Sequence, residues 1–199
     1  MKMTLVSRRW LGALLLVLGG RLSQSAYADE PTAFALVKEG NRHLGEEAKD
    51  RIVQIRSEKS IATLTPNVWF VVYYDPDATA RATEIKFVGG KKASVKRPAR
   101  LLEPITGAHR ELPKEKLKID SDKALEIAKA EPALKNLTLK ASRLTLERAG
   151  YGDETVVWKV RLWAAKLKNP NHDADIGEVF VSAEDGKVVK TDLRPNRVD

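Results

Sequence analysis

Cysteine is absent from all 199 positions of the sequence. The chain therefore has no disulfide bond, no thiol chemistry, no cysteine-ligated metal and no lipid-modified cysteine. Histidine is scarce as well, since its three copies, His43, His109 and His172, lie in separate segments. None is paired at metal-ligand spacing, so we interpret all three as solvent-facing and expect neither a metal nor a cofactor.

Long apolar runs are confined to the beginning of the chain, and no later run is long enough to span a membrane. Arg8 and Arg9 precede an apolar stretch over residues 10–20, and Ala26-Tyr27-Ala28 forms a small-x-small cleavage site. This pattern is typical of a secretory signal peptide, whose apolar core is too short to cross a bilayer. We therefore expect residues 1–28 to be removed on export.

The mature chain is expected to begin at Asp29 and to reside in the periplasm or be secreted. Ser7-Arg8-Arg9-Trp10-Leu11 also resembles a twin-arginine signal, although Gly12 and Ala13 break that pattern. Both the general secretory route and the twin-arginine route therefore remain open.

The positive charge of the sequence is partly a property of this signal. The full chain carries 35 basic and 27 acidic residues, a net charge of +8. Residues 1–28 hold four of the basic residues and no acidic one, which leaves 31 against 27, or +4, for the mature chain. A balance of +4 needs no nucleic acid to explain it, and we expect no nucleic-acid partner.

Residues 155–166 carry the clearest strand pattern, because apolar and mixed positions alternate along them. One side is wholly apolar and consists of Val156, Trp158, Val160, Leu162 and Ala164. The other side consists of Val157, Lys159, Arg161, Trp163 and Ala165. A strand of this kind has one dry face, which we expect a helix over residues 121–131 to cover. Asp120 or Ser121 would cap that helix.

A hairpin is expected after this strand. Two β-branched runs, 177–183 and 188–193, flank Asp185-Gly186, a pair that accepts the backbone angles of a tight turn. A further strand over residues 140–148, with Leu144 and Leu146 pointing inward, precedes residues 155–166.

The order helix, strand, strand, hairpin ends on the phrase Glu178-Val179-Phe180-Val181-x-Ala183-x-x-Gly186-Lys187-Val188. This combination resembles the PepSY domain family over residues 115–195. The resemblance implies a helix packed on an antiparallel sheet. It also implies the family's setting, in peptidase propeptides or as free-standing modules outside the cytoplasm. The family has no catalytic residues to carry over.

The first part of the mature chain repeats this order. Residues 31–49 have helical spacing, and residues 50–58 fit either a continued helix or a strand. Residues 68–74 form a strand that is apolar on both sides. A second strand over 84–88, a Gly89-Gly90 turn and a return over 91–97 complete the set.

We interpret this repetition as an internal duplication. Trp69 then corresponds to Trp158, Phe87 to Val181 and Gly90 to Gly186, although any two antiparallel sheets with tryptophans can be aligned in this way. The expected fold class is α+β, with two PepSY-like repeats, each a helix packed on an antiparallel β-sheet. The expected units are residues 29–98 and 121–199, joined by a linker, 99–120, that packs on the sheets through Leu101, Leu102 and Ile105. If the two units have separate cores, replacements of Trp69 and Trp158 should be nearly additive.

The candidate partner-binding residues are Lys159, Arg161 and Trp163, with Phe180 expected close by on a neighbouring strand. Aromatic rings beside cations form an adhesive surface for peptides or anionic groups. The alternative is that the lysine and arginine stems simply shield Trp163 from water.

The corresponding face of the first unit is apolar and is expected to be buried by the linker, the other unit or a partner. Its residues are Val68, Phe70, Val72 and Tyr74. A basic edge is also expected there, which would block strand addition. Its residues are Lys91, Lys92, Lys96, Arg97 and Arg100.

Residues 169–175 place oxygen-bearing side chains at alternate positions, as calcium loops do. Ile176 stands where such a loop requires glycine, and Ser182 where it requires a bidentate glutamate, so an EF-hand is excluded. We interpret the segment as a solvated loop, with a casual surface cation as the alternative.

The sequence has no Gly-x-Ser-x-Gly turn and no glycine-rich phosphate loop. We therefore expect an exported, non-enzymatic binding module with a protein or peptide partner in the cell envelope. The PepSY resemblance implies binding or inhibition of a peptidase. The alternative is a small-ligand carrier or an envelope scaffold, and an enzyme ranks third. A pocket between helix and sheet would favour the carrier, and an open aromatic and basic sheet face would favour the protein binder.

Overall fold

The computed structural model describes residues 30–97, 111–150 and 153–199. The expected signal peptide, the start at Asp29 and part of the linker lie outside these residues. So do Arg100, Leu101, Leu102, Ile105 and His109. Within the described ranges, no helix has the length and apolar character needed to cross a membrane.

In the part of the chain that the structure describes, the fold is α+β, with two short α-helices packed against one antiparallel sheet. The helices are α1 (Ala33–Gly40) and α2 (Ser121–Lys129). The first four strands are β1 (Ile52–Ser57), β2 (Val68–Tyr74), β3 (Ala82–Val88) and β4 (Lys91–Lys96). The other four are β5 (Leu139–Arg148), β6 (Val156–Ala165), β7 (Asp173–Ser182) and β8 (Val188–Leu193).

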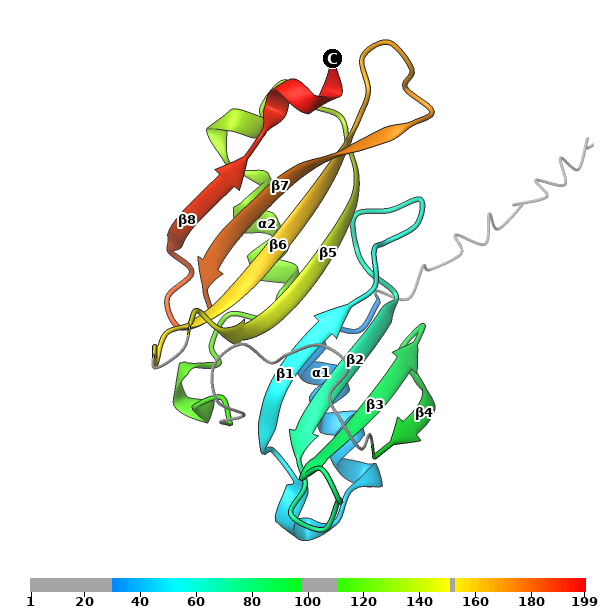
Figure 1. The fold of residues 1–199 in the computed structure, drawn as a ribbon, viewed down its shortest axis with the longest axis vertical. Coiled ribbons are helices and arrows are strands. Elements are labelled where there is room, and N and C mark those ends of the chain that lie inside the picture. Colours follow the sequence, from blue (N-terminus) through cyan, green and yellow to red (C-terminus); the bar gives the residue numbers. More distant parts are fainter. Residues whose placement is uncertain (1–29, 98–110, 151–152) are drawn as a thin grey trace, which may run out of the picture.

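All eight strands belong to one continuous sheet, in the order β4-β3-β2-β1-β5-β6-β7-β8 (Figure 1). From the centre to either edge, the strands therefore follow one another in chain order. The halves are joined by the antiparallel pair β1–β5, in which Ile55 lies opposite Leu146 and Arg56 opposite Thr145. β4 and β8 form the two edges of the sheet.

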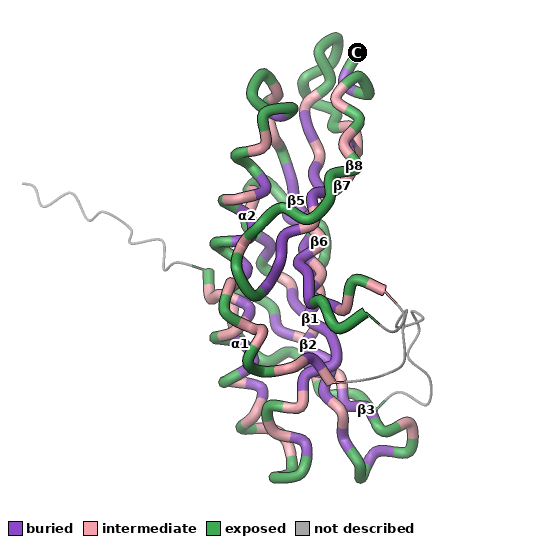
Figure 2. Tube along the Cα trace, turned by 90° about the vertical axis from the view of Figure 1, so that its left-hand side faces the viewer, coloured by how far each residue is buried: buried purple, intermediate pink, exposed green. Residues whose placement is uncertain are grey.

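Both helices lie on the same side of the sheet, α1 over the first half and α2 over the second (Figure 2). The main core is a continuous cluster between these helices and the sheet, and a small second cluster consists of Val53, Val72 and Ala82. The expected dry face of β6 is confirmed, since Val156, Trp158, Val160, Leu162 and Ala164 are all buried in the main core. The opposite side of the sheet is called the helix-free face below.

Trp69 and Trp158 belong to the same core. Their ring centroids are 6.5 Å apart and the rings meet edge to face, at 84°. The condition of separate cores is therefore not met, and replacements at the two positions are expected to be coupled instead of additive.

The first helix is shorter than the expected 31–49. α1 ends at Gly40, and Leu44 and Gly45 already have extended backbone angles. Gly40 also faces Tyr73 so closely that an added Cβ would lie 2.1 Å from the tyrosine hydroxyl. Residues 50–58 fitted either a continued helix or a strand in the sequence, and the structure shows that they contain the central strand β1 (Ile52–Ser57).

The N-termini of the two helices meet. The Asp120 carboxylate caps α2 by accepting from the Ser121 N–H at 2.7 Å, and it also accepts from the Phe34 N–H of α1 at 3.1 Å. The Ser121 hydroxyl accepts from the Ala33 N–H at 2.9 Å. One pair of side chains thus satisfies free amide groups of both helices.

The chain from residue 111 to α2 contacts the first half of the sheet. Leu112 is buried, and its N–H donates to the Ile52 carbonyl at 2.7 Å. Arg51 holds the neighbouring Glu111 in an ion pair of 2.6 Å. The chain is therefore fixed along the free end of β1 before it reaches α2.

Candidate functional site

The four candidate residues lie together on the helix-free face of β6 and β7. Lys159 is paired with Phe180, which was expected to lie close by on a neighbouring strand. Arg161 and Trp163 follow along β6, and all four side chains are partly exposed. The structure therefore brings the candidate residues into one patch.

The ammonium group of Lys159 forms an ion pair with Glu147 of the neighbouring strand β5. The other oxygen of Glu147 accepts from the Gln54 side chain of β1 at 2.7 Å. Glu147 and Gln54 are both buried, and a buried carboxylate needs such partners. Lys159 is thus anchored to the joint between the two halves of the sheet.

Arg161 is also held by carboxylates. Its Nε lies 2.9 Å from Glu178 Oε1 and 3.7 Å from Asp175 Oδ2, both on β7. The positive charges of Lys159 and Arg161 are therefore neutralised by neighbouring carboxylates. The patch combines these ion pairs with the aromatic rings of Trp163 and Phe180.

Two lysines from other segments lie over the aromatic rings of the patch. Lys59 Nζ, from the β1–β2 connection, lies 4.7 Å from the Trp163 ring centroid. Lys190 Nζ of β8 lies 5.3 Å from the Phe180 centroid, and Lys159 Nζ lies 5.8 Å from it on the other side. Sequence reasoning missed both additions. The hairpin register could have indicated Lys190, but no local signal connects Lys59 with Trp163.

A straight row of paired residues crosses the helix-free face through this patch. From β4 to β8 it consists of Ser94, Lys86, Phe70, Arg56, Thr145, Lys159, Phe180 and Lys190. In the first half, the Phe70 ring lies between Arg56 Cζ, at 4.2 Å, and Lys86 Nζ, at 5.0 Å. Aromatic rings between cations therefore recur on both halves of this face.

Within the described chain, one of the four apolar residues of the first-half face is buried. Val72 is 1% exposed and packs with Val53 and Ala82 in a small second cluster, whereas Val68, Phe70 and Tyr74 are partly exposed. Arg51 Cζ lies 4.3 Å from the Tyr74 centroid, so a long basic side chain covers part of this ring.

A hollow of about 640 Å³ borders the patch. Its walls come from the β1–β2 connection, the start of β5 and the β6–β7 connection, and include Lys59, Lys140, His172 and Asp173. Lys59 forms an ion pair of 2.7 Å with Asp173 across it. Lys59 therefore lines the hollow and also contacts the Trp163 ring of the patch.

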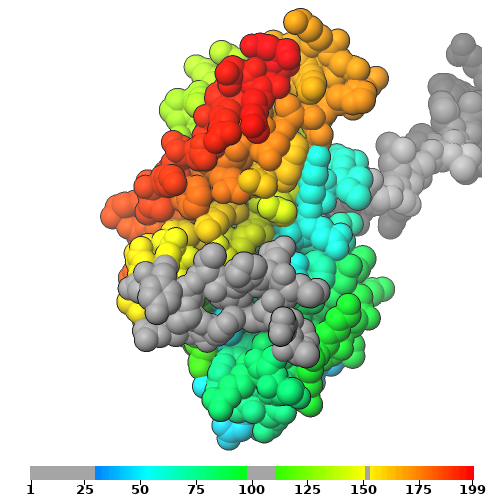
Figure 3. Space-filling model, in the orientation of Figure 1, coloured from blue at the N-terminus to red at the C-terminus, as the bar shows by residue number. Residues whose placement is uncertain are grey.

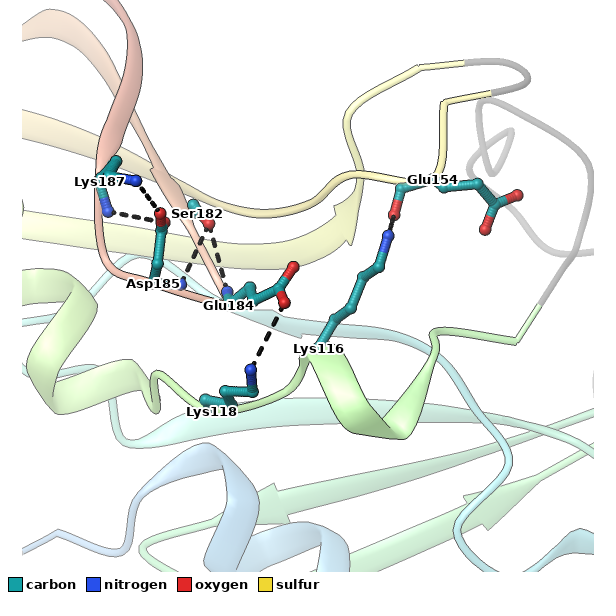
Figure 4. A network of polar contacts seen from close by, with 7 residues as sticks. All are labelled: Lys116, Lys118, Glu154, Ser182, Glu184, Asp185 and Lys187. Atoms are coloured by element: carbon teal, nitrogen blue, oxygen red, sulfur yellow. Dashed lines mark hydrogen bonds and ion pairs between the residues drawn. The ribbon is translucent and has the colours of Figure 1, made fainter.

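The β7–β8 turn, which carries part of the PepSY-like phrase, is a closed polar network (Figure 4). The Ser182 hydroxyl accepts from the amides of Glu184 and Asp185, each at 3.3 Å. Hydrogen bonds from Lys187 and Ser182 hold the pKa of the Asp185 carboxyl far below its usual range. Lys118 lies 3.4 Å from Glu184 and ties the turn to the segment before α2. These contacts stabilise the conformation of the β7–β8 turn.

Two histidines can be placed. His172 is exposed as expected, but His43 is only partly exposed, with its Nε2 buried 3.7 Å from Glu39 Oε1. The interpretation of His43 as solvent-facing is therefore wrong, because the residue packs back against α1. Across residues 30–97, 111–150 and 153–199, no three histidine or acidic side chains gather as a metal site.

Known proteins provide no counterpart. The chain matches no family model, no curated protein and no solved structure. The PepSY resemblance therefore remains a prediction that depends on the residues quoted for it.

Proposed function

We propose that this protein is an exported, non-enzymatic binding module made of two PepSY-like units, which holds a protein or peptide partner in the cell envelope. The contact would be made by the helix-free face around Lys159, Arg161, Trp163 and Phe180. The observation that carries the proposal is the partial exposure, on adjacent strands, of Trp163 and Phe180 beneath lysine ammonium groups.

The spacing of equivalent positions supports two related units. Trp158 follows Trp69 by 89 residues, and the first residue of α2, Ser121, follows that of α1, Ala33, by 88. Trp69 pairs with Phe87, and Trp158 pairs with Val181. These are the correspondences expected from a duplication.

Irregularities of the strands recur at corresponding places. The register between β3 and β4 shifts at Lys86/Phe87, and that between β7 and β8 shifts at Phe180/Val181. At the centre of the sheet, the residue 89 positions after Arg56 is Thr145. Thr145 is also the residue that lies opposite Arg56 in the β1–β5 pair. Two similar units related by a local two-fold axis would produce this register.

The chemistry of the surface favours a partner with its own charged and apolar groups. Ion pairs between partly exposed side chains contribute about 0–1 kcal/mol each, so a partner carboxylate can replace Glu178 or Asp175 at Arg161 at little cost. Aromatic and arginine side chains are the usual anchors of protein interfaces. The PepSY resemblance suggests a peptidase as the partner, by analogy alone.

The decisive experiment compares binding by the wild type and a double variant, Trp163→Ala with Arg161→Ala. Partners captured from envelope extract by the wild type are identified, purified and titrated against both proteins. We expect the double variant to keep its thermal midpoint within a few degrees and to lose most of its affinity, since an interface anchor commonly contributes about 2 kcal/mol or more. Salt should weaken the Arg161 contribution and leave that of Trp163 largely intact.

The matched control is Lys91→Ala with Lys92→Ala, which removes two positive charges from the exposed β4 edge. It should bind as the wild type does. Unchanged binding by the Trp163/Arg161 variant would refute the proposed surface, and a large fall in its stability would show that Trp163 is part of a core. Turnover of a peptide or ester by the purified protein, abolished by a single replacement on its surface, would refute the non-enzymatic part.

A hollow beside α1 favours the second candidate, a small-ligand carrier. It measures about 420 Å³ and lies between α1, β1 and the segment before α2, with Phe34, Val37 and Ile52 among its walls. At its rim, hydrogen bonds from Lys114 and Asn41 lower the pKa of Asp50. Native mass spectrometry of the protein recovered from envelope would show a bound small molecule if this candidate is right. An envelope scaffold would show neither such a ligand nor loss of a partner in the Trp163/Arg161 variant.

A further inference from the structure

The two edges of the sheet differ in chemistry. The β4 edge carries three exposed lysines, Lys91, Lys92 and Lys96. Like charges of this kind oppose pairing with another strand. On the β8 edge, Val188 and Val189 are 36% and 51% exposed, and the charged residues are one cation, Lys190, and one anion, Asp192. Figure 3 shows the β8 segment on the surface along one border of the molecule. β8 is therefore the edge with less protection against strand addition.

The backbone of β8 presents hydrogen-bonding groups away from the sheet. The Arg194 N–H donates inward, to the Ile176 carbonyl of β7, at 2.7 Å. Backbone groups of successive residues alternate in direction along a strand, so those of Leu193 and Thr191 point outward. A second strand can reach these groups because the sheet order ends at β8.

The sequence of β8 is complementary to itself in one antiparallel register. A two-fold axis through Thr191 places Thr191 opposite its own copy, in a pair whose outward N–H and C=O groups can bond twice. The same register places Lys190 opposite Asp192 of the second copy, and Asp192 opposite its Lys190. It also places Val189 opposite Leu193 of the second copy. Charged residues meet opposite charges, and apolar residues meet apolar residues.

We propose that β8 pairs with β8 of a second copy of this chain, antiparallel about Thr191, to form a two-fold dimer with one continuous sheet. Lys190 and Asp192 lie on the helix-free face, because they pair with Phe180 and Glu178. The row through Lys159, Phe180 and Lys190 of one copy would continue into Asp192, Glu178 and Arg161 of the other. The dimer does not depend on the proposed partner binding, but it would join two candidate surfaces into one.

Analytical ultracentrifugation of the purified protein tests the dimer directly. We expect a species with twice the chain mass that dissociates on dilution. Thr191→Pro removes one outward N–H, and proline is tolerated on an edge strand whose N–H faces solvent. This variant should be a monomer whose thermal midpoint is near that of the wild-type monomer obtained on dilution. The matched control Thr191→Val keeps the N–H and the β-branched shape and should remain a dimer.

A charge exchange provides a second test that does not depend on proline. Lys190→Asp places like charges opposite each other at both ends of the pairing and should raise the dissociation constant by about ten-fold or more. Adding Asp192→Lys to this variant restores opposite charges and should restore the wild-type dissociation constant within about three-fold. A merely structural role of Lys190 would not give this recovery.

Three outcomes would overturn the proposal. One is a wild-type monomer at every concentration up to the high micromolar range. Another is a dimer that survives Thr191→Pro. The third is a dimer weakened by Lys190→Asp that the second replacement fails to restore. A monomeric wild type that instead captures extended peptides along β8 would assign this edge to a different partner and would likewise refute the dimer.

Discussion

The two halves of the sheet place a helix over their strands by different means. In the first half, Gly40 of α1 makes room for Tyr73 of β2, whose buried hydroxyl donates to the Val37 carbonyl at 3.1 Å. In the second half, the positions 88 and 89 residues later are Ala128 and Leu162, both fully buried and without a polar side-chain atom. The first half thus combines a glycine on the helix with a large ring on the strand. The second half combines an alanine on the helix with a smaller apolar side chain on the strand.

On the proposed correspondence of the two units, this exchange of size would allow similar helix–sheet contacts to be built from dissimilar residues. Close packing penalises a change of even one methylene group unless its neighbour changes in the opposite sense. The first half adds a directional hydrogen bond that fixes the helix on the strand. The second half has apolar side chains at these two positions, but Trp158 Nε1 of β6 donates to the Ile119 carbonyl just before α2 at 2.8 Å. Its strands are also longer, since β5, β6 and β7 each have ten residues against seven in β2 and β3.

The largest effect is expected at the contact that unites the halves, the pair Trp69 and Trp158. Each replacement by alanine should destabilise the fold by about 3–5 kcal/mol, because each ring is buried. Since the rings touch, the double variant should lose less than the sum, with a coupling of about 0.5–1.5 kcal/mol. Urea denaturation of the two single variants and the double variant measures this coupling. Strict additivity would indicate independent cores, and an unchanged midpoint for Trp158→Ala would refute the correspondence of the two tryptophans.

The next largest loss of stability is expected from changing the contact between Gly40 and Tyr73. Gly40→Ala improves helix propensity by about 1 kcal/mol but forces a methyl group against the Tyr73 hydroxyl, so a net loss of about 1–3 kcal/mol is expected. Tyr73→Leu, which copies the second half, should recover much of that loss when combined with Gly40→Ala. The comparison fails if the double variant is no more stable than Gly40→Ala alone. Ala128→Gly is the control in the second half and should lose stability without any clash.

The strands on which this comparison depends could largely be predicted from the sequence. The alternation of Val156 to Leu162 with Lys159 and Arg161 is a local signal, and β6 follows it. β1 could not be assigned, because its first four residues, including Gln54, are all buried and leave no alternation to detect. The helix expected over residues 31–49 ends at Gly40 and is followed by short 3-10 turns over Asn41–His43 and Glu46–Ala48.

The candidate surface could be predicted only in part. Lys159 and Phe180 were expected to lie close together on neighbouring strands, and the β6–β7 pair places them opposite each other. The ion pairs of Lys159 with Glu147 and of Arg161 with Glu178 join the neighbouring strand pairs β5–β6 and β6–β7, so the pairing of these strands alone could have indicated them. The contact of Lys59 with Trp163 instead joins segments whose approach is set by the β1–β5 pair, on which the sequence pattern contains no information.

A smaller difference is expected between the caps of the two helices. Thr32 caps only α1, accepting from the Ala35 N–H at 3.4 Å, whereas Asp120 serves α2 and the Phe34 N–H of α1. Asp120→Ala should therefore lose about 1–2 kcal/mol and Thr32→Ala about 0.5–1 kcal/mol. Amide hydrogen exchange shows which helices each replacement destabilises, because only Asp120→Ala should speed exchange in both α1 and α2. Asp120→Asn retains a capping oxygen and is the control. Equal losses for the two alanine variants would contradict the shared role of Asp120.

The smallest effect at neutral pH is expected from the Tyr73 hydroxyl, which has no counterpart at Leu162. Tyr73→Phe removes one hydrogen bond and should lose about 1 kcal/mol. Burial, and secondarily the negative charge of Asp50, raises the pKa of Tyr73 well above its ordinary value near 10. Above about pH 10 the unfolded chain releases this proton while the folded chain retains it, so the stability of the wild type falls as the pH rises. The stability of Tyr73→Phe should fall less over the same range, and the two curves should converge. Parallel curves for wild type and Tyr73→Phe, measured by urea denaturation from pH 8 upward, would show that the buried hydroxyl is not what distinguishes the first half.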